Sequence, residues 1–140
     1  MEAWFARSVA RQFLDASNRC LRDERQPPTA RGPALVPAVV CAAFAAEVGL
    51  KAILIGEGSP SDGHKLNVLF RRLSQASKQE LVRQTGYTQE RFDAELPVAS
   101  NAFVEWRYVY EEHASKSVSQ QFLLLLATAA IKVAERFNAA

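Results

Sequence analysis

Apolar side chains recur at every third or fourth position along most of the chain, which is the spacing that brings them onto one face of an α-helix. Arginines and Asp15 separate the apolar positions of residues 2–25, so the pattern predicts an amphipathic N-terminal helix. The apolar face of this helix consists of Trp4, Phe5, Val9, Phe13 and Ala16. Three prolines and a glycine follow within residues 27–33. Because proline lacks the backbone donor that a helix needs, the helix cannot continue into them.

The same spacing predicts further helices beyond this break. A long second helix is expected at residues 34–56, where alanine and glycine occupy many positions, and a third at residues 64–73. Ser77 is expected to cap a short fourth helix, because Glu80 follows three residues later as in a capping box. This helix is predicted to end near Gly86, since glycine commonly terminates helices.

A fifth helix is predicted from Thr88 to residue 110 with a kink at Pro97, and a last one at residues 120–137. Alternation typical of a strand occurs in residues 106–110, which is too short a run to outweigh the helical pattern. The predicted fold class is therefore all-α, with five or six helices. The 140 residues fit one domain, spanning residues 1–140.

Composition narrows the class of protein. With 49% apolar and 23% charged residues, the chain can bury a core. Residues 34–55 are long enough to span a membrane, but each of Glu47 and Lys51 would cost about 2.5–3.5 kcal/mol at a bilayer centre. No membrane span is predicted. The N-terminus carries no apolar stretch of signal-peptide length, so the expected location is the cytoplasm.

A net charge of only +2 excludes a uniformly basic coat for nucleic acid. Residues 65–91 nevertheless hold six basic and two acidic residues. This stretch is either a solvated helix face or a contact for a phosphate backbone, made by Arg71 and Arg72. Cys20 and Cys41 stand alone in the sequence, so neither a disulfide framework nor a zinc site is predicted, and no metal or cofactor is expected.

The pair Arg107 and His113 suits RNA cleavage without a metal ion. A histidine can pass protons as general base or general acid. A guanidinium can hold the scissile phosphate through several donors and offset the charge that develops on it. The neighbouring rings of Trp106, Tyr108 and Tyr110 can stack on bases.

A purely structural interpretation of the same segment stays open. In it Arg107 forms an ion pair with Glu111 one turn later, and His113 has no role. On one continuous helix, Arg107 and His113 would lie about 120° apart around the axis and about 9 Å apart along it. A catalytic pair therefore requires the helix to end between them or two subunits to face each other.

Further polar residues of interest lie near the second and third helices. Glu47 and Lys51 have the spacing of an intrahelical ion pair. His64 is expected to bond neighbouring backbone at the start of the third helix, with a catalytic role as the alternative. The loop at residues 56–63 lacks the contiguous glycine, lysine and hydroxyl residues of a phosphate-binding P-loop. Asp62 in this loop can cap the next helix.

Residues 47–54, residues 63–70 and residues 103–111 together carry a resemblance to a known family. In this order they closely resemble segments of HEPN domains (higher-eukaryote and prokaryote nucleotide-binding domains), and the resemblance covers about residues 34–137. It implies an up-and-down helical bundle that dimerises. Such domains often belong to toxin–antitoxin, abortive-infection or CRISPR-linked systems.

Many HEPN domains are metal-independent ribonucleases in which an arginine precedes a histidine by a short interval, and Arg107 and His113 fit that interval. The resemblance implies that Arg107 binds the phosphate and His113 transfers a proton, in a cleft where two subunits meet. Attack by the adjacent 2′-hydroxyl would leave a cyclic phosphate. Active members usually place Asn, Asp or His directly after the arginine, where this chain has Tyr108 as a third candidate catalytic residue.

The expected function is therefore that of a metal-independent endoribonuclease or RNA-binding component of a toxin–antitoxin or defence system. The protein would act as a homodimer, with a nucleotidyltransferase-type or other antitoxin as partner. The alternative is a non-catalytic HEPN module that binds a partner protein or a nucleotide.

Overall fold

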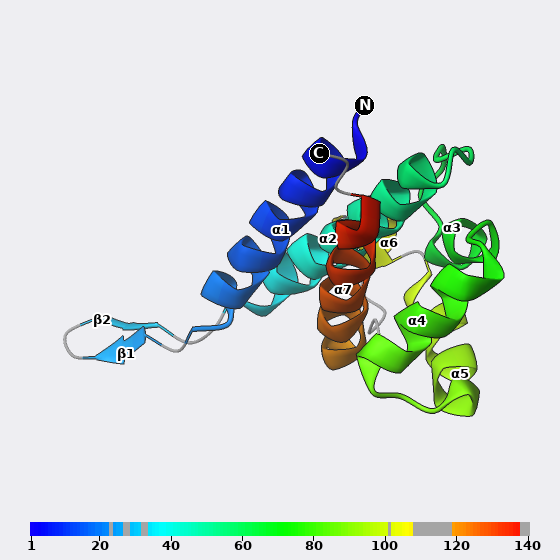
Figure 1. Cartoon of the computed structure of the whole chain (residues 1–140). Coiled ribbons are helices and arrows are strands. Elements are labelled where there is room, and N and C mark those ends of the chain that lie inside the picture. Colours follow the sequence, from blue (N-terminus) through cyan, green and yellow to red (C-terminus); the bar gives the residue numbers. More distant parts are fainter. Residues whose placement is uncertain (23, 27–28, 32–33, 101, 108–118, 138–140) are drawn as a thin grey trace.

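The computed structural model describes residues 1–22, 24–26, 29–31, 34–100, 102–107 and 119–137. These residues form a packed bundle of α-helices, as the sequence predicts, with one small hairpin beside it (Figure 1). The helices are α1 (Ala3–Cys20), α2 (Leu35–Gly56), α3 (Leu66–Arg71), α4 (Gln75–Thr85), α5 (Gln89–Ala99), α6 (Ala102–Arg107) and α7 (Gln120–Ala134), and a 3-10 turn, η2 (Glu135–Phe137), follows the last of them.

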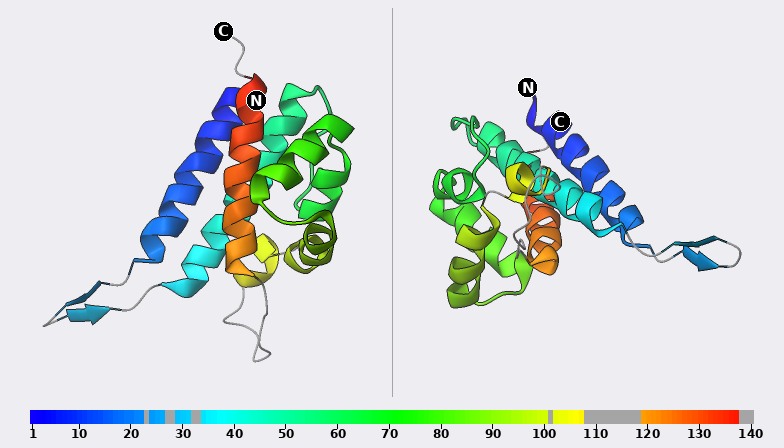
Figure 2. Two further views of the ribbon diagram at one scale, coloured as in Figure 1. Left: turned by 60° about the horizontal axis from the view of Figure 1, so that its bottom comes forward. Right: turned by 180° about the vertical axis from the view of Figure 1, so that it is seen from behind.

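The bundle is organised around α2. Helices α1, α3, α6 and α7 all pack against it, and α4 packs against α7. Figures 1 and 2 show α1 on one side of α2 and α7, and the short helices α3, α4 and α5 on the other. Thirteen of the residues of α2 are buried, and many of these are alanines that allow neighbouring helices to approach closely.

Helix α2 is long and apolar enough to cross a membrane, and it is the one such helix in the described part of the chain. Its apolar window has a mean hydropathy of 2.1, but 72% of that window is buried inside the protein. Contacts with four other helices therefore account for its apolar character.

The fourth helix begins earlier than predicted, because Ser74 rather than Ser77 is its N-cap. The Ser74 side chain accepts a hydrogen bond from the backbone N–H of Ser77 at 3.2 Å. The Glu57 carboxylate in turn accepts hydrogen bonds from the backbone N–H and hydroxyl of Ser74 and from the hydroxyl of Ser77. The predicted end near Gly86 is confirmed, since Gly86 has a φ of 77°, which is the left-handed conformation that glycine favours.

The single helix predicted from Thr88 to residue 110 is wrong in the described residues, which form α5 and α6 instead. Thr88 caps α5 as expected, and Pro97 lies inside it. The break follows Ala99, because the carbonyl of Ser100 accepts a hydrogen bond from the backbone N–H of Leu66 at the start of α3. The hydroxyl of Ser100 also bonds Asn67. A contact from a distant segment thus replaces the next helical hydrogen bond.

A short antiparallel hairpin was not predicted. Strand β1 (Glu24–Gln26) pairs with β2 (Thr29–Arg31), with Arg25 opposite Ala30. The predicted N-terminal helix over residues 2–25 is correspondingly shorter, because α1 ends at Cys20. Three-residue strands are too short to show a periodic pattern in the sequence.

Candidate functional site

Helix α6 contains the first residues of the predicted RNA-cleaving segment and packs against α2. The ring of Phe103 lies 4.6 Å, centroid to centroid, from the ring of Phe44 on α2. Trp106, which we expected to stack on RNA bases, is half-buried and packs against the core. Arg107 is the last described residue of α6.

The remaining residues of this prediction lie outside the described part of the chain. They are Tyr108, Tyr110 and His113, together with Glu111 of the structural alternative and the side chain of Arg107. The catalytic pair and its alternative therefore both stay predictions.

The basic stretch at residues 65–91 is partly neutralised by its surroundings. Arg72 donates to the backbone carbonyl of Asp62 at 2.7 Å and lies 3.4 Å from the Asp62 carboxylate, so it fastens the loop before α3. Asp62 is thus a partner of Arg72 rather than a helix cap. Arg71, the other predicted RNA contact, is exposed.

Two more arginines of this stretch also have partners. Arg83 donates two hydrogen bonds to Glu80, which lower the pKa of Glu80 to about 2. The guanidinium of Arg91 lies 4.2 Å from the ring centroid of Tyr87. Glu80 already counts among the two acidic residues of this stretch and the Tyr87 ring carries no charge, so the compensation added from outside the stretch comes from Asp62.

A cluster of polar side chains joins α2 to the loop before α3. The predicted ion pair is confirmed, with the Lys51 ammonium 3.1 Å from Glu47 Oε1. Nδ1 of His64 lies 2.8 Å from the same oxygen. The histidine thus contacts a side chain seventeen positions earlier rather than the neighbouring backbone.

The chemistry of this cluster follows from its burial. The Glu47 side chain is 1% exposed, whereas that of His64 is 64% exposed. With a carboxylate as its partner, Nδ1 of His64 is the donor of this hydrogen bond. A buried carboxylate that orients a histidine in this way is a familiar arrangement for proton transfer.

Glu47 is only half satisfied. Lys51 and His64 both contact its Oε1 atom. Its Oε2 atom is buried and has no hydrogen-bond partner in the described structure. An unpartnered buried carboxylate oxygen is unusual, because it has lost its hydration without compensation. The sequence offered a signal for this cluster, since Glu47 is an acidic residue in the middle of an otherwise apolar helix.

This cluster lines a pocket of about 470 Å³ between α1, α2 and the loop before α3. Most of its lining is apolar, and polar side chains come from α2 and from the loop before α3. The lining residues are Met1, Ala6, Val9, Phe44, Glu47, Val48, Lys51, Ile55, Ser61, Asp62 and His64. Volume and lining are in the range of pockets that bind small molecules.

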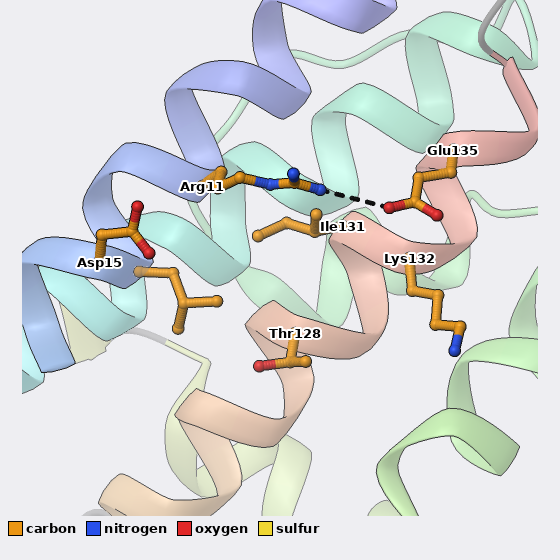
Figure 3. Close-up of a pocket in the computed structure, with 7 residues that line it drawn as sticks. Arg11, Asp15, Thr128, Ile131, Lys132 and Glu135 are labelled. Atoms are coloured by element: carbon orange, nitrogen blue, oxygen red, sulfur yellow. Dashed lines mark hydrogen bonds and ion pairs between the residues drawn. The ribbon is translucent and has the colours of Figure 1, made fainter.

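A second pocket, of about 370 Å³, lies between α1 and α7 (Figure 3). Figure 3 shows Arg11 reaching across it to Glu135, with 3.2 Å between the charged atoms. Asp15 and Lys132 complete a balanced set of charges around the rim. Both members of the ion pair are about half exposed, so water screens their attraction.

Metal and thiol chemistry find little support in the described residues. No group of three or more His, Cys, Asp or Glu side chains there is arranged to hold a metal ion. Cys20 and Cys41 are both free thiols. Burial, and secondarily the nearness of Cys20, raises the pKa of the Cys41 thiol and makes it less reactive.

Comparisons with protein-family models, with curated proteins and with solved structures find no match for this chain. The fold and site described above therefore rest on the chain's own residues.

Proposed function

We propose that this protein is a HEPN-type bundle that binds RNA and cleaves it without a metal ion, acting as a homodimer. The observation that carries the proposal is the way three separate segments meet on α2. Residues 47–54 are part of α2 itself, and residues 63–70 reach it through the bond from His64 to Glu47. The described part of the third segment, residues 103–107, reaches α2 through Phe103. These are the three segments on which the family resemblance rests.

The chemistry assigned to the pair follows from its residue types. Arg107 binds the scissile phosphate through its fork of donors and offsets the negative charge of the transition state. His113 removes the proton of the attacking 2′-hydroxyl or donates one to the leaving oxygen. In a homodimer the two residues come from facing subunits, which removes the need for them to converge on one helix. Tyr108 adds a hydroxyl beside the phosphate.

A second candidate function is a non-catalytic module that binds a partner protein, such as a nucleotidyltransferase-type antitoxin. The engagement of Arg72 with Asp62 favours it, because this engagement weakens the basic surface predicted for RNA. Tyr108 favours it too, since it replaces the smaller polar residue of active HEPN domains. In this case Arg107 forms its ion pair with Glu111.

Cleavage of end-labelled single-stranded RNA in excess EDTA tests the proposal. We expect the wild-type protein to produce fragments with cyclic-phosphate ends, and His113→Ala and Arg107→Ala to lose this activity with unchanged helical content. Glu135→Gln, which alters the pocket between α1 and α7, serves as the control and should cleave as wild type does. Absence of cleavage by the wild-type protein favours the non-catalytic module. Equal cleavage by wild type and His113→Ala would remove His113 from the catalytic site.

A further inference from the structure

The pocket beside Glu47 contains an unsatisfied acceptor, and this points to a ligand. Oε2 of Glu47 is shielded from water and has no donor in the described structure. A buried carboxylate oxygen left in this state destabilises the protein, because its lost hydration is not replaced. A molecule that occupies the pocket and presents a donor to this carboxylate would remove that penalty. Because the outer torsion of a glutamate side chain is soft, the carboxylate can turn either oxygen toward such a donor.

The charges around Glu47 indicate what kind of donor fits. Lys51 already lies 3.1 Å from the carboxylate and compensates its negative charge, while Asp62, the other carboxylate in the lining, has Arg72 as its partner. A second cation would leave an excess of positive charge at a largely dehydrated site, which is unfavourable. The missing group is therefore a neutral N–H or O–H rather than an ammonium.

The walls of the pocket define the rest of the ligand. Phe44, Val48 and Ile55 of α2, together with Ala6 and Val9 of α1, present apolar surface. The polar lining comes from Glu47 and Lys51 of α2 and from the loop residues before α3, among them His64. The body of the ligand must be apolar to gain free energy by leaving water for such walls.

We propose that this pocket binds a small, uncharged and largely apolar molecule, which donates one hydrogen bond to the Glu47 carboxylate. The site goes beyond RNA cleavage, because its described lining comes from α1, α2 and the loop before α3 together with Met1. Its chemistry needs only residues of α1, α2 and the loop before α3.

A pair of matched probes tests the role of the donor. Indole and benzofuran have nearly the same size and shape, but indole carries an N–H group where benzofuran carries an oxygen acceptor. We expect titration calorimetry to show that indole binds about tenfold to hundredfold more tightly, since hydrogen bonds to charged groups have that strength. In NMR spectra, the carboxyl carbon of Glu47 should shift with indole and much less with benzofuran.

Two variants and a control show whether the preference for indole depends on Glu47 and on this pocket. Glu47→Gln should reduce the preference for indole, because a neutral amide oxygen is a weaker acceptor than a carboxylate. Ile55→Phe should weaken the binding of both probes by filling the pocket, and it remains informative if Glu47→Gln does not fold. Glu135 lines the other pocket, so Glu135→Gln should leave the affinities for indole and benzofuran unchanged.

Equal affinities of indole and benzofuran for the wild-type protein would overturn the proposal, as would the absence of binding by either. Shifts spread over the whole surface instead of residues around Glu47 would also overturn it. RNA cleavage does not enter these measurements, so a failure of this proposal and a failure of the proposed ribonuclease function remain distinguishable.

Discussion

Gly49 shows how much a single residue decides in this fold. It lies on α2 where α7 comes closest, and a Cβ atom placed on Gly49 would be 2.9 Å from the Cβ of Ala130. Atoms of this kind do not approach each other so closely, and both helices are held by the core on their other sides. The absence of a side chain at Gly49 therefore sets the distance between α2 and α7.

We expect Gly49→Ala to destabilise the protein by about 1–2 kcal/mol. Overpacking costs about 1–3 kcal/mol, and the better helix propensity of alanine offsets up to about 1 kcal/mol of this. Urea denaturation measures the change. The double variant Gly49→Ala with Ala130→Gly should show a coupling that recovers part of the loss. A Gly49→Ala protein as stable as wild type would mean that the two helices can move apart freely.

At this scale the sequence predicted some site residues and missed the role of others. The ion pair between Glu47 and Lys51 followed from their spacing, because both partners lie on one helix. The contact between Glu47 and His64 did not, since it joins residues that only the packing of the loop onto α2 brings together. The unpartnered oxygen of Glu47 is likewise a property of the tertiary structure.

At the scale of elements, the helix predicted from Thr88 to residue 110 is two helices in the described residues, and the other errors lie at helix ends. The second helix was predicted at residues 34–56 and is found at Leu35–Gly56. The start of α4 was misplaced because the cap at Ser74 is reinforced by Glu57, which belongs to the end of a different helix. The break between α5 and α6 likewise depends on a bond from α3. Local patterns do not contain such bonds.

Glu57 makes the junction between α2 and α4 sensitive to acid. Burial alone would raise its pKa, but hydrogen bonds from Ser74 and Ser77 and the charge of Arg136 outweigh burial, so the pKa is lowered from its usual 4.5. A carboxyl with a lower pKa in the folded than in the unfolded state stabilises the fold fully above its unfolded pKa. This stabilisation is lost as the pH falls through the folded pKa.

We therefore expect the free energy of unfolding to decrease as the pH falls below about 4.5, and Glu57→Gln to make this decrease smaller. At neutral pH, Glu57→Gln should be less stable than wild type by about 1–3 kcal/mol, because hydrogen bonds to a charged acceptor are replaced by weaker ones. Urea denaturation between pH 3 and pH 7 measures both effects. Glu90→Gln on the exposed side of α5 is the control. Parallel pH profiles of wild type and Glu57→Gln would contradict this role.

At the scale of the whole molecule, α2 connects the described parts of the bundle. The all-α class was predictable because apolar residues recur at helical spacing over most of the chain. Helices with such an apolar face bury it against one another. The hairpin at β1 and β2 and the pocket beside Glu47 were not predictable, since they depend on how segments come together. The proposed RNA site, by contrast, was predicted from residue types and from the family resemblance, and several of its residues lie outside the described part of the chain.

Mixing two inactive variants tests whether the proposed site is shared between subunits. A dimer of one Arg107→Ala chain and one His113→Ala chain still contains an intact Arg107 on one subunit and an intact His113 on the other. If the two residues act across the interface, one complete site remains in each mixed dimer. We therefore expect RNA cleavage in EDTA to reappear when the variants are unfolded, mixed and refolded together.

Each variant refolded alone should stay inactive, and size-exclusion chromatography should show a dimer in all three samples. If the pair instead acted within one chain, a mixed dimer would hold no complete site, and mixing would restore nothing. An active protein that elutes as a monomer would contradict the shared site directly. Recovery in the mixture alone therefore requires an interface that brings Arg107 of one subunit to His113 of the other.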